Sequence, residues 1–224
     1  MMSVRSALFA SIAFGLLIAP SCAETGEKQA DRGLVTAETP VPEDASDRRD
    51  DGILRDKTGR PVTHSLLGEV FPSFVAERSD GRSFSTNELM GQWTVMTVWG
   101  VWCHDSRNDA ENIAAVAAHF ETDPDVDYVS IHVPQSEKRL ENRFRKYGSV
   151  DGYFEERGLS WPTVLDETAD IRSALEINWT PTYLVIGPDL TVHGYRTDLS
   201  VVEGDTAIAD FIADVETLIA GQVQ

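Results

Sequence analysis

Cysteine is nearly absent from this chain of 224 residues, which contains only Cys22 and Cys103. Basic residues are also scarce: 19 Lys and Arg stand against 37 Asp and Glu, giving a formal net charge of −18. Nucleic acids and anionic membranes are bound through clustered Lys and Arg, and the sequence shows no such patch. We therefore expect neither as the main partner, and we interpret the acidity as a solubility feature.

Apolar runs long enough to cross a membrane are lacking near the N-terminus. The run over residues 7–19 is shorter than the roughly 20 residues that a spanning helix needs. Arg5 precedes it and small residues follow it, which predicts an export signal over residues 1–23 and a location in the bacterial periplasm or cell envelope. Cleavage before Glu24 would remove Cys22, whereas a lipobox would make Cys22 a lipid anchor. An uncleaved anchor is the remaining alternative.

If Cys22 is removed or lipidated, Cys103 is the one free thiol of the mature protein. A leftover cysteine in an oxidising compartment is a reactive thiol or an intermolecular partner. A metal site is not expected, because the adjacent Cys103 and His104 cannot easily ligate one ion and only His132 could complete the set. No cofactor is expected either. The other histidines, His64, His119 and His193, have no evident partners in the sequence.

The sequence divides into four segments. After the signal, residues 24–51 are polar and charged and predict a disordered acidic linker. Residues 52–67 form an N-terminal extension with a turn signal and a possible hairpin. Residues 68–224 have the length and the apolar periodicity of one domain, which we expect to be a monomer.

Within this domain, extended segments alternate with helical ones. Strands are predicted at 94–99, 126–133, 161–165, 183–186 and 190–195, and helices at 110–120, 136–147, 169–175 and 208–219. A loop through Gly148, Gly152 and Gly158 is expected after the second helix. Alternation of this kind favours an α/β fold with a central sheet covered on both sides, and the last two strands add an antiparallel hairpin.

A tryptophan-rich motif carries a family resemblance. The spacing Trp99-x-x-Trp102-Cys103-x-x-Ser106 resembles the Trp-x-x-Trp-Cys-x-x-Cys active site of the thioredoxin-like superfamily. The segment 68–74, with the later Asp80-Gly81, Leu89 and Gly91, is similar to the exported TlpA-like redoxins.

A second motif, Thr180-Pro181-Thr182, resembles the cis-proline loop of the same superfamily. The resemblance covers roughly residues 68–219. It implies a thioredoxin fold, with a central mixed β-sheet flanked by helices and, in this chain, an N-terminal extension. A plain trans proline at a strand start is the alternative for Pro181.

Several positions depart from the family pattern. Ser106 replaces the second cysteine, and Asp109 stands where TlpA-like proteins commonly carry Glu. Glu111 replaces a frequent proline, and Thr97 replaces the buried acid of thioredoxin. That acid would move a proton for the second cysteine, so its loss agrees with an oxygen at position 106.

Cys103 is the expected nucleophile. The first turn of a helix favours the thiolate, which is the reactive form. His104 would add positive charge beside it, and Asp105 and Asp109 would modulate its ionisation. Ser106 could donate a hydrogen bond to the thiolate but could not release a partner, because an alcohol is a poor nucleophile near neutral pH.

The resemblance also implies a substrate surface. Pro181 would lie against the cysteine, and the backbone of Thr180 would pair with an extended substrate. Trp102, Trp179 and Trp99, with His104, would contact the bound polypeptide, although a strand aromatic such as Trp99 more often fills the core.

Three hypotheses follow. The first is a monothiol thiol–disulfide oxidoreductase or isomerase-like protein, which acts on protein or small-molecule thiols and disulfides through a mixed disulfide at Cys103. The second is a non-catalytic binding module in which Cys103 is inert. The third is a single-cysteine peroxidase; that family's motif places proline and threonine where Met96 and Gly100 stand, so it ranks last.

Overall fold

The computed structural model describes residues 33–202 and 205–222, so the expected export signal and Cys22 lie outside the described residues. Its centre is one seven-stranded sheet with the order β2-β1-β5-β4-β3-β6-β7. The strands are β1 (Val75–Arg78), β2 (Ser83–Ser85), β3 (Trp93–Trp99), β4 (Val126–His132), β5 (Thr163–Leu165), β6 (Thr182–Ile186) and β7 (Val192–Thr197).

The sheet is mixed, as predicted. Strand β3 pairs parallel with β4, and β4 pairs parallel with β5. The hairpin β6–β7 joins the other side of β3 in antiparallel register, and β1 and β2 form an antiparallel edge beyond β5. Parallel neighbours require crossover connections, and the helices between these strands supply them.

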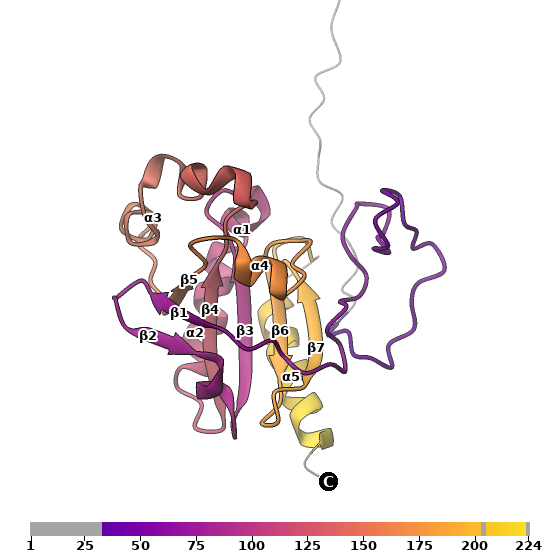
Figure 1. Cartoon of the computed structure of the whole chain (residues 1–224). Helices are drawn as coiled ribbons and strands as arrows, with labels where there is room; N and C mark the ends of the chain where they lie inside the picture. The colour runs from indigo at the N-terminus through magenta and orange to yellow at the C-terminus, as the bar shows by residue number, and fades with distance from the viewer. Residues whose placement is uncertain (1–32, 203–204, 223–224) are drawn as a thin grey trace, which may run out of the picture.

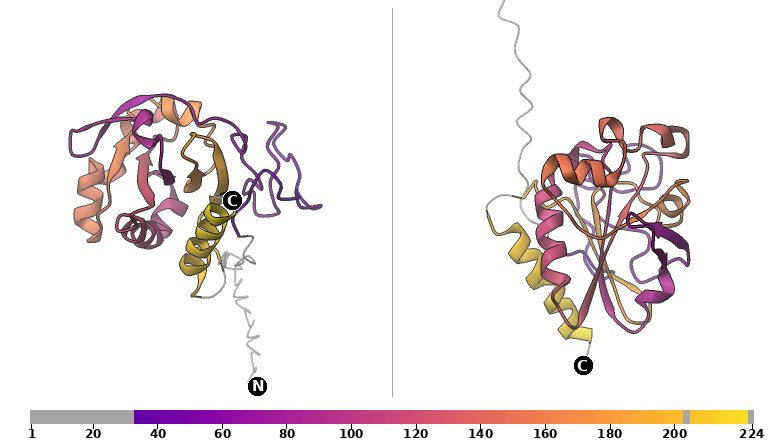
Figure 2. Two further views of the ribbon diagram at one scale, coloured as in Figure 1. Left: turned by 90° about the horizontal axis from the view of Figure 1, so that it is seen from below. Right: turned by 90° about the vertical axis from the view of Figure 1, so that its left-hand side faces the viewer.

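Helices cover both faces of the sheet. The α-helices are α1 (His104–Asn108), α2 (Ala110–Phe120), α3 (Val150–Arg157), α4 (Asp170–Ala174) and α5 (Ala207–Gln222), and the 3-10 helices are η1 (Thr86–Leu89), η2 (Glu137–Asn142) and η3 (Arg145–Tyr147). Helices α2 and α5 lie on one face, while α4 and η1 lie on the other (Figure 2). Among the described residues, no helix combines the length and the apolarity that a membrane crossing needs.

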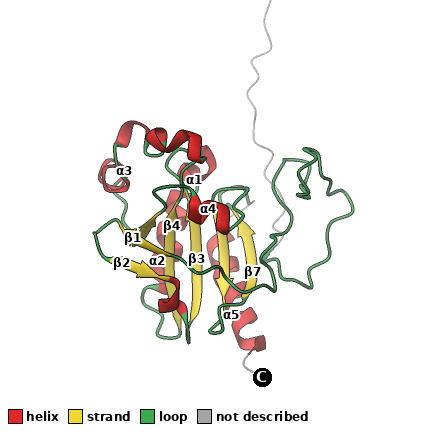
Figure 3. Cartoon of the chain, viewed as in Figure 1, coloured by secondary structure: helices red, strands yellow, loops and turns green. Residues whose placement is uncertain are grey.

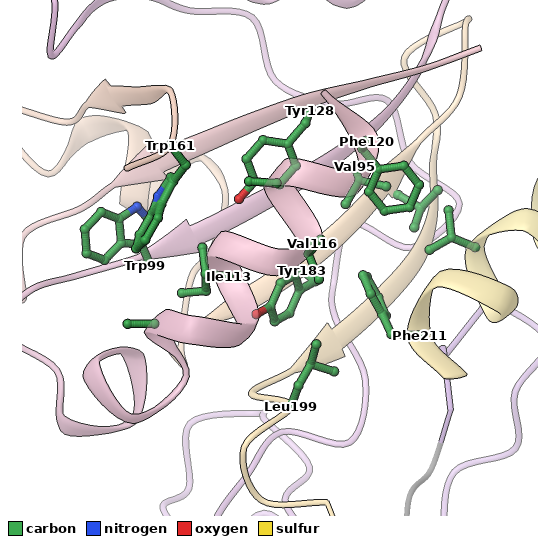
Figure 4. Close-up of a cluster of buried hydrophobic side chains, with 14 of the residues drawn as sticks. Val95, Trp99, Ile113, Val116, Phe120, Tyr128, Trp161, Tyr183, Leu199 and Phe211 are labelled. Atoms are coloured by element: carbon green, nitrogen blue, oxygen red, sulfur yellow. The ribbon is translucent and has the colours of Figure 1, made fainter. Parts of the chain in front are cut away.

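Strand β3 supplies side chains to both cores because successive residues point to opposite faces. All seven of its residues are buried. Val95 and Trp99 pack with Ile113 of α2 and Phe211 of α5 (Figure 4). Met96 faces the other way, into the core beneath α4. A strand buried on both faces is therefore the rigid base from which the following loop starts.

Residues 136–158 differ from their prediction. The expected helix over 136–147 is two short 3-10 helices, η2 and η3, and the expected glycine loop contains helix α3. Ser149 caps α3 by accepting a hydrogen bond from the Gly152 N–H, and Gly158 ends it in the left-handed conformation at φ 65°. Buried Tyr153 and Phe154 hold the helix in place, and this packing outweighs the glycine that interrupts its pattern.

Residues 24–32 of the expected disordered linker lie outside the described residues. Residues 33–51 run as loop without a helix or strand (Figure 3), and they make defined contacts. Val35 is buried and exchanges two backbone hydrogen bonds with Tyr195 on the outer edge of β7. Strand β7 would otherwise present unpaired backbone groups at that edge. The sequence did not predict the pairing of Val35 with Tyr195, because the surrounding residues are mostly charged and polar.

The extension at 52–67, for which a hairpin is possible, contains a tight turn closed by an antiparallel bridge between Arg55 and Pro61. Arg55 bridges both Ser46 and Pro61, and the Asp56 N–H donates to the Arg60 carbonyl. The chain then returns to β7, where Leu67 bridges Val192. This extension lies beside the sheet on the β7 side (Figure 1).

Asp198 attaches the extension to the domain. Its carboxylate accepts two hydrogen bonds of 3.1 Å from the Arg60 guanidinium and one of 3.0 Å from the indole N–H of Trp179. The Asp198 side chain is 1% exposed and that of Arg60 is 15% exposed. Removal of one partner from such a pair leaves the other charge buried without a counterion, which is unfavourable.

We expect Asp198→Ala to lower the free energy of unfolding by about 3 kcal/mol and to expose residues 52–65 to limited proteolysis. The matched control is Asp80→Ala, which breaks an exposed, solvent-screened pair with Arg82 and should cost far less stability than Asp198→Ala. Denaturant titration and timed proteolysis measure both effects. Equal losses for the two variants would contradict the anchoring role of Asp198.

Candidate functional site

Cys103 lies at the N-cap of helix α1, just beyond the end of strand β3. Its own N–H donates to the Gly100 carbonyl at 2.9 Å and closes a tight turn. A side chain at Gly100 would not fit, because a Cβ atom there would meet the Trp102 indole nitrogen at 2.3 Å. Cys103 is partly exposed, so the turn keeps this residue out of the fully buried core.

The two motifs recognised in the sequence meet at this sulfur. The Thr180–Pro181 peptide bond is cis. The Cys103 thiol donates to the Thr180 carbonyl oxygen, with the two atoms 3.2 Å apart. These residues are 77 positions apart in the chain. The arrangement therefore depends on the pairing of β3 with β6, whose ends carry the two loops.

Ser106 is fully buried and has a different contact from the one expected. Its hydroxyl accepts a hydrogen bond from the Gly100 N–H at 3.2 Å. Among the described residues, no other hydrogen bond is found for the Ser106 hydroxyl, and none joins it to Cys103. The expectation that Ser106 supports the thiolate directly is thus replaced by a structural contact that holds the turn.

The three tryptophans have separate environments. Trp99 is fully buried, with its ring 5.0 Å from that of Trp161, and so it is a core residue and not part of a substrate rim. Trp102 is partly exposed and its indole N–H donates to the Val133 carbonyl at 2.7 Å. Trp179 is also partly exposed and is held by Asp198. Trp102 and Trp179 each precede one of the two residues in contact at the sulfur.

His104 and Asp105 begin helix α1. His104 is exposed, and its ring Nε2 lies 3.1 Å from the Asn108 side-chain nitrogen. Asp105 is half-buried, and burial raises the pKa of its carboxyl; the nearby Asp198 raises it further, while Arg60 opposes the shift.

Asp109 ends α1 and is fully buried beneath the site. It accepts hydrogen bonds of 2.7 Å from the Tyr183 hydroxyl, the Asn112 side chain and the Ser200 N–H. Burial nevertheless dominates and raises the pKa of Asp109 to about 7. A buried acid that titrates near neutral pH is a candidate functional group, although its contacts also join α2, β6 and the chain before α5.

The raised pKa has a defined consequence for stability. The folded state holds the Asp109 proton more tightly than the unfolded chain, where the ordinary value is 3.8. Protonated Asp109 therefore contributes on the order of a few kcal/mol to the free energy of unfolding. This contribution is complete below about pH 4 and is lost as the pH rises toward 7. We expect Asp109→Asn to remove this slope, so that the variant gains stability relative to wild type between pH 4 and 7. Unfolding titrations across that range test it, and parallel curves for the two proteins would contradict it.

Three arginines surround the active-site turn, and the sequence analysis did not identify them. The Arg107 guanidinium donates to the carbonyls of Val101 and Cys103 at 2.8 and 3.0 Å. Arg145 donates to the Trp102 carbonyl at 3.4 Å, and the guanidinium of Arg172 lies 5.6 Å from the centre of the Trp102 ring. The position of Arg107, four residues after Cys103, was a signal in the sequence that it lies near the turn. Arg145 and Arg172 belong to distant segments of the sequence, and only the fold brings them to the turn.

His132 supports the turn that carries Cys103. Its Nε2 accepts a hydrogen bond from the Val101 N–H at 3.2 Å, and burial lowers the pKa of the ring to about 3. The imidazole is therefore neutral. In the described residues, no group of three or more His, Cys, Asp or Glu side chains is arranged to hold a metal ion.

A mixed sheet between two helical layers, with a helix-capping cysteine against a cis-proline loop, defines a protein of the thioredoxin-like class. A model of the AhpC/TSA family matches residues 67–195, and the chain belongs to this family.

Relatives of known name agree with this class. The chain is 25% identical over 122 residues to the thiol-disulfide oxidoreductase ResA of Bacillus subtilis, which covers 54% of this chain and 62% of that protein, less than two thirds of its length. It is 27% identical over 140 residues to ResA of Halalkalibacterium halodurans, covering 61% and 73%. In fold it is similar to the thioredoxin domain of a thiol-disulfide oxidoreductase from Bacteroides vulgatus, with a TM-score of 0.50, 19% identity, and coverage of 68% and 96%.

Proposed function

We propose that this protein is a monothiol thiol–disulfide oxidoreductase that acts through a mixed disulfide at Cys103. The observation that carries the proposal is the 3.2 Å contact between a partly exposed thiol and the carbonyl before a cis-proline. An inert thiol would be expected in the core, away from solvent and from such a loop. The relatives named as thiol-disulfide oxidoreductases support the same chemistry.

The first step is attack by the Cys103 thiolate on a disulfide. Its sulfur lies at a helix N-terminus, where unpaired N–H groups favour negative charge. Arg107 and Arg172 add positive charge near the sulfur. A new bond forms between Sγ and one substrate sulfur, the substrate S–S bond breaks, and the departing thiolate takes a proton from water.

The second step needs an external thiol. The Ser106 hydroxyl is a far weaker nucleophile than a thiolate, and it is buried against the Gly100 N–H. An incoming thiolate, from the substrate or from a small molecule, must therefore attack the mixed disulfide and return Cys103 to the reduced form. The cycle permits exchange and isomerisation with no net oxidation of the protein.

The residues around the sulfur form the proposed substrate surface. Thr180 lies against Cys103 and is followed by the cis-proline Pro181. The partly exposed Trp102 and Trp179 precede Cys103 and Thr180 in the sequence. An extended polypeptide would pair with the backbone at Thr180 and contact both indoles. His104 is exposed at the start of α1 and would adjust the local charge.

We further propose that the protein is exported through residues 1–23 and acts in the cell envelope, either released before Glu24 or attached through Cys22. Disulfides persist in such compartments, so exchange chemistry has substrates there. We expect the domain over residues 68–224 to act as a monomer, since the proposed surface is built from one chain.

The direct test is covalent trapping. The purified protein is incubated with insulin, quenched with iodoacetamide and analysed by mass spectrometry before and after reduction. We expect one insulin molecule per protein molecule, attached at Cys103 and released by dithiothreitol. Non-covalent binding without an adduct would favour the binding-module hypothesis, and rapid consumption of hydrogen peroxide through a sulfenic acid would favour the peroxidase. Either result would overturn the proposal.

A further inference from the structure

A cavity of about 650 Å³ lies between the N-terminal extension and the segment that runs from α4 to the cis-proline loop. The N-terminal segment contributes residues 51–54, 61 and 63–65 to its wall. The domain contributes residues 172–173, 176–179, Thr182 and Tyr195. A volume of this size suits a small ligand of a few residues better than a folded polypeptide.

Two of the wall residues connect the cavity to the reactive sulfur. Arg172 lines the cavity, lies over the Trp102 ring and interacts electrostatically with Cys103. Trp179 also lines the cavity, and the next residue is Thr180, whose carbonyl accepts the Cys103 thiol hydrogen bond. Cys103 is not itself a wall residue, so a ligand held in the cavity would have to extend past Arg172 and Trp179 to reach the sulfur.

Arg172 brings to this wall a positive charge that has no direct ion pair, although Asp166 interacts with it electrostatically. Its Nη1 atom is buried and has no hydrogen-bond partner, and no ion pair is found for its side chain within residues 33–202 and 205–222. A buried guanidinium nitrogen without an acceptor is unfavourable. A carboxylate, which accepts from guanidinium groups in a bidentate manner, would satisfy it.

His64 provides a second unpartnered donor in the same wall. Its Nδ1 accepts a hydrogen bond from the Leu66 N–H at 3.2 Å, so the neutral ring carries its proton on Nε2. His64 is 9% exposed, and its Nε2 has no hydrogen-bond partner. Burial lowers the pKa of His64 to about 4, which keeps the ring neutral and Nε2 a donor.

The acidic residues of the wall differ in availability. Asp51 is engaged by Arg55 through hydrogen bonds of 2.7 and 2.8 Å. Glu176 is exposed, and the salt bridges of the described residues do not include it. The cavity thus offers one available cation, one available anion and a neutral donor. This charge pattern matches a ligand with both a carboxylate and an ammonium group.

We propose that this cavity binds a small cysteinyl peptide of two or three residues, with its carboxylate on Arg172, its ammonium group toward Glu176 and its sulfur at Cys103. The proposal rests on the proposed function and names the small thiol that completes the exchange. When this thiol attacks the mixed disulfide, its sulfur bonds to the Cys103 sulfur, the bond to the substrate sulfur breaks, and the substrate thiolate leaves. A second small thiol then frees Cys103 and departs as the disulfide; two thiols are oxidised and the original substrate disulfide is reduced.

The test uses glutathione disulfide as the probe, with its tetraethyl ester, which lacks carboxylates, as the matched comparison. The rate of adduct formation at Cys103 is followed by mass spectrometry on the full chain. We expect Arg172→Gln to slow both reactions, because it removes a positive charge near the sulfur, and to slow the reaction with glutathione disulfide about 10-fold or more beyond the slowing seen with the ester. The control variant Arg157→Gln removes an exposed arginine of α3 and should change neither rate.

A binding measurement separates this proposal from the exchange chemistry. S-methylglutathione cannot form a disulfide, so its calorimetric binding reports on the cavity alone. We expect binding to the wild type, a loss of about 10-fold in affinity in Arg172→Gln and a smaller loss in His64→Leu. Absence of binding, or an equal slowing of both disulfide probes in Arg172→Gln, would overturn the cavity proposal while leaving exchange at Cys103 intact. Binding without any adduct would overturn the proposed function but support the cavity as a peptide site.

Discussion

Replacement of Cys103 by serine is expected to abolish every covalent adduct, a decrease of at least about a thousandfold. The thiolate is the only group in the proposed mechanism that forms a bond to the substrate, and a serine hydroxyl cannot replace it near neutral pH. The substitution is small and the position is partly exposed, so the fold should be retained. Mass spectrometry after incubation with insulin, together with thermal unfolding of the variant, measures both points.

The other cysteine of the chain provides the matched control. Cys22→Ser should form adducts at the wild-type rate, because Cys22 belongs to the expected export signal. Adducts that survive in Cys103→Ser and vanish in Cys22→Ser would place the reactive thiol outside the described site and end the proposal.

Ser106→Cys, which introduces the second cysteine of a Cys-x-x-Cys motif, is expected to turn a protein that accumulates mixed disulfides into one that releases them. Residue 106 follows Cys103 within the first turn of α1, so a thiol there would be placed to attack the mixed disulfide intramolecularly. Such intramolecular attack gains from a high effective concentration. We expect the lifetime of the adduct to fall about 100-fold or more and insulin reduction by dithiothreitol to become catalytic. The decay of a purified adduct, followed by non-reducing electrophoresis, gives the rate.

Ser106→Ala is the control that distinguishes the effect of the added thiol from the effect of losing the serine hydroxyl. Because Ser106 takes no chemical part in release, the alanine variant should hold its mixed disulfide as long as the wild type. It should lose about 1 kcal/mol of stability, since the Gly100 N–H loses its acceptor. A short-lived adduct in Ser106→Ala would show that the serine had protected the disulfide, and the gain in Ser106→Cys would then need another explanation.

Local patterns were sufficient for much of the fold. The β-branched run at 94–99 predicted the central strand, and the apolar period at 208–219 predicted the last helix; both were confirmed. These predictions succeeded because strand and helix periods are recorded in neighbouring residues. Where capping and long-range packing competed with composition, as at residues 136–158, the prediction was wrong.

By itself the sequence determined the candidate nucleophile, its place at a helix start and the serine three residues later, because these are facts of spacing within a few residues. Only the tertiary structure decided that Thr180 lies against Cys103 and that Asp109 is fully buried. It also decided that Arg172 lines the same cavity as His64 of the N-terminal extension. Hydrogen bonding, burial and charge act over a few ångströms of space. Residues separated by dozens of positions enter that range only when the sheet has assembled and the extension has packed against its edge.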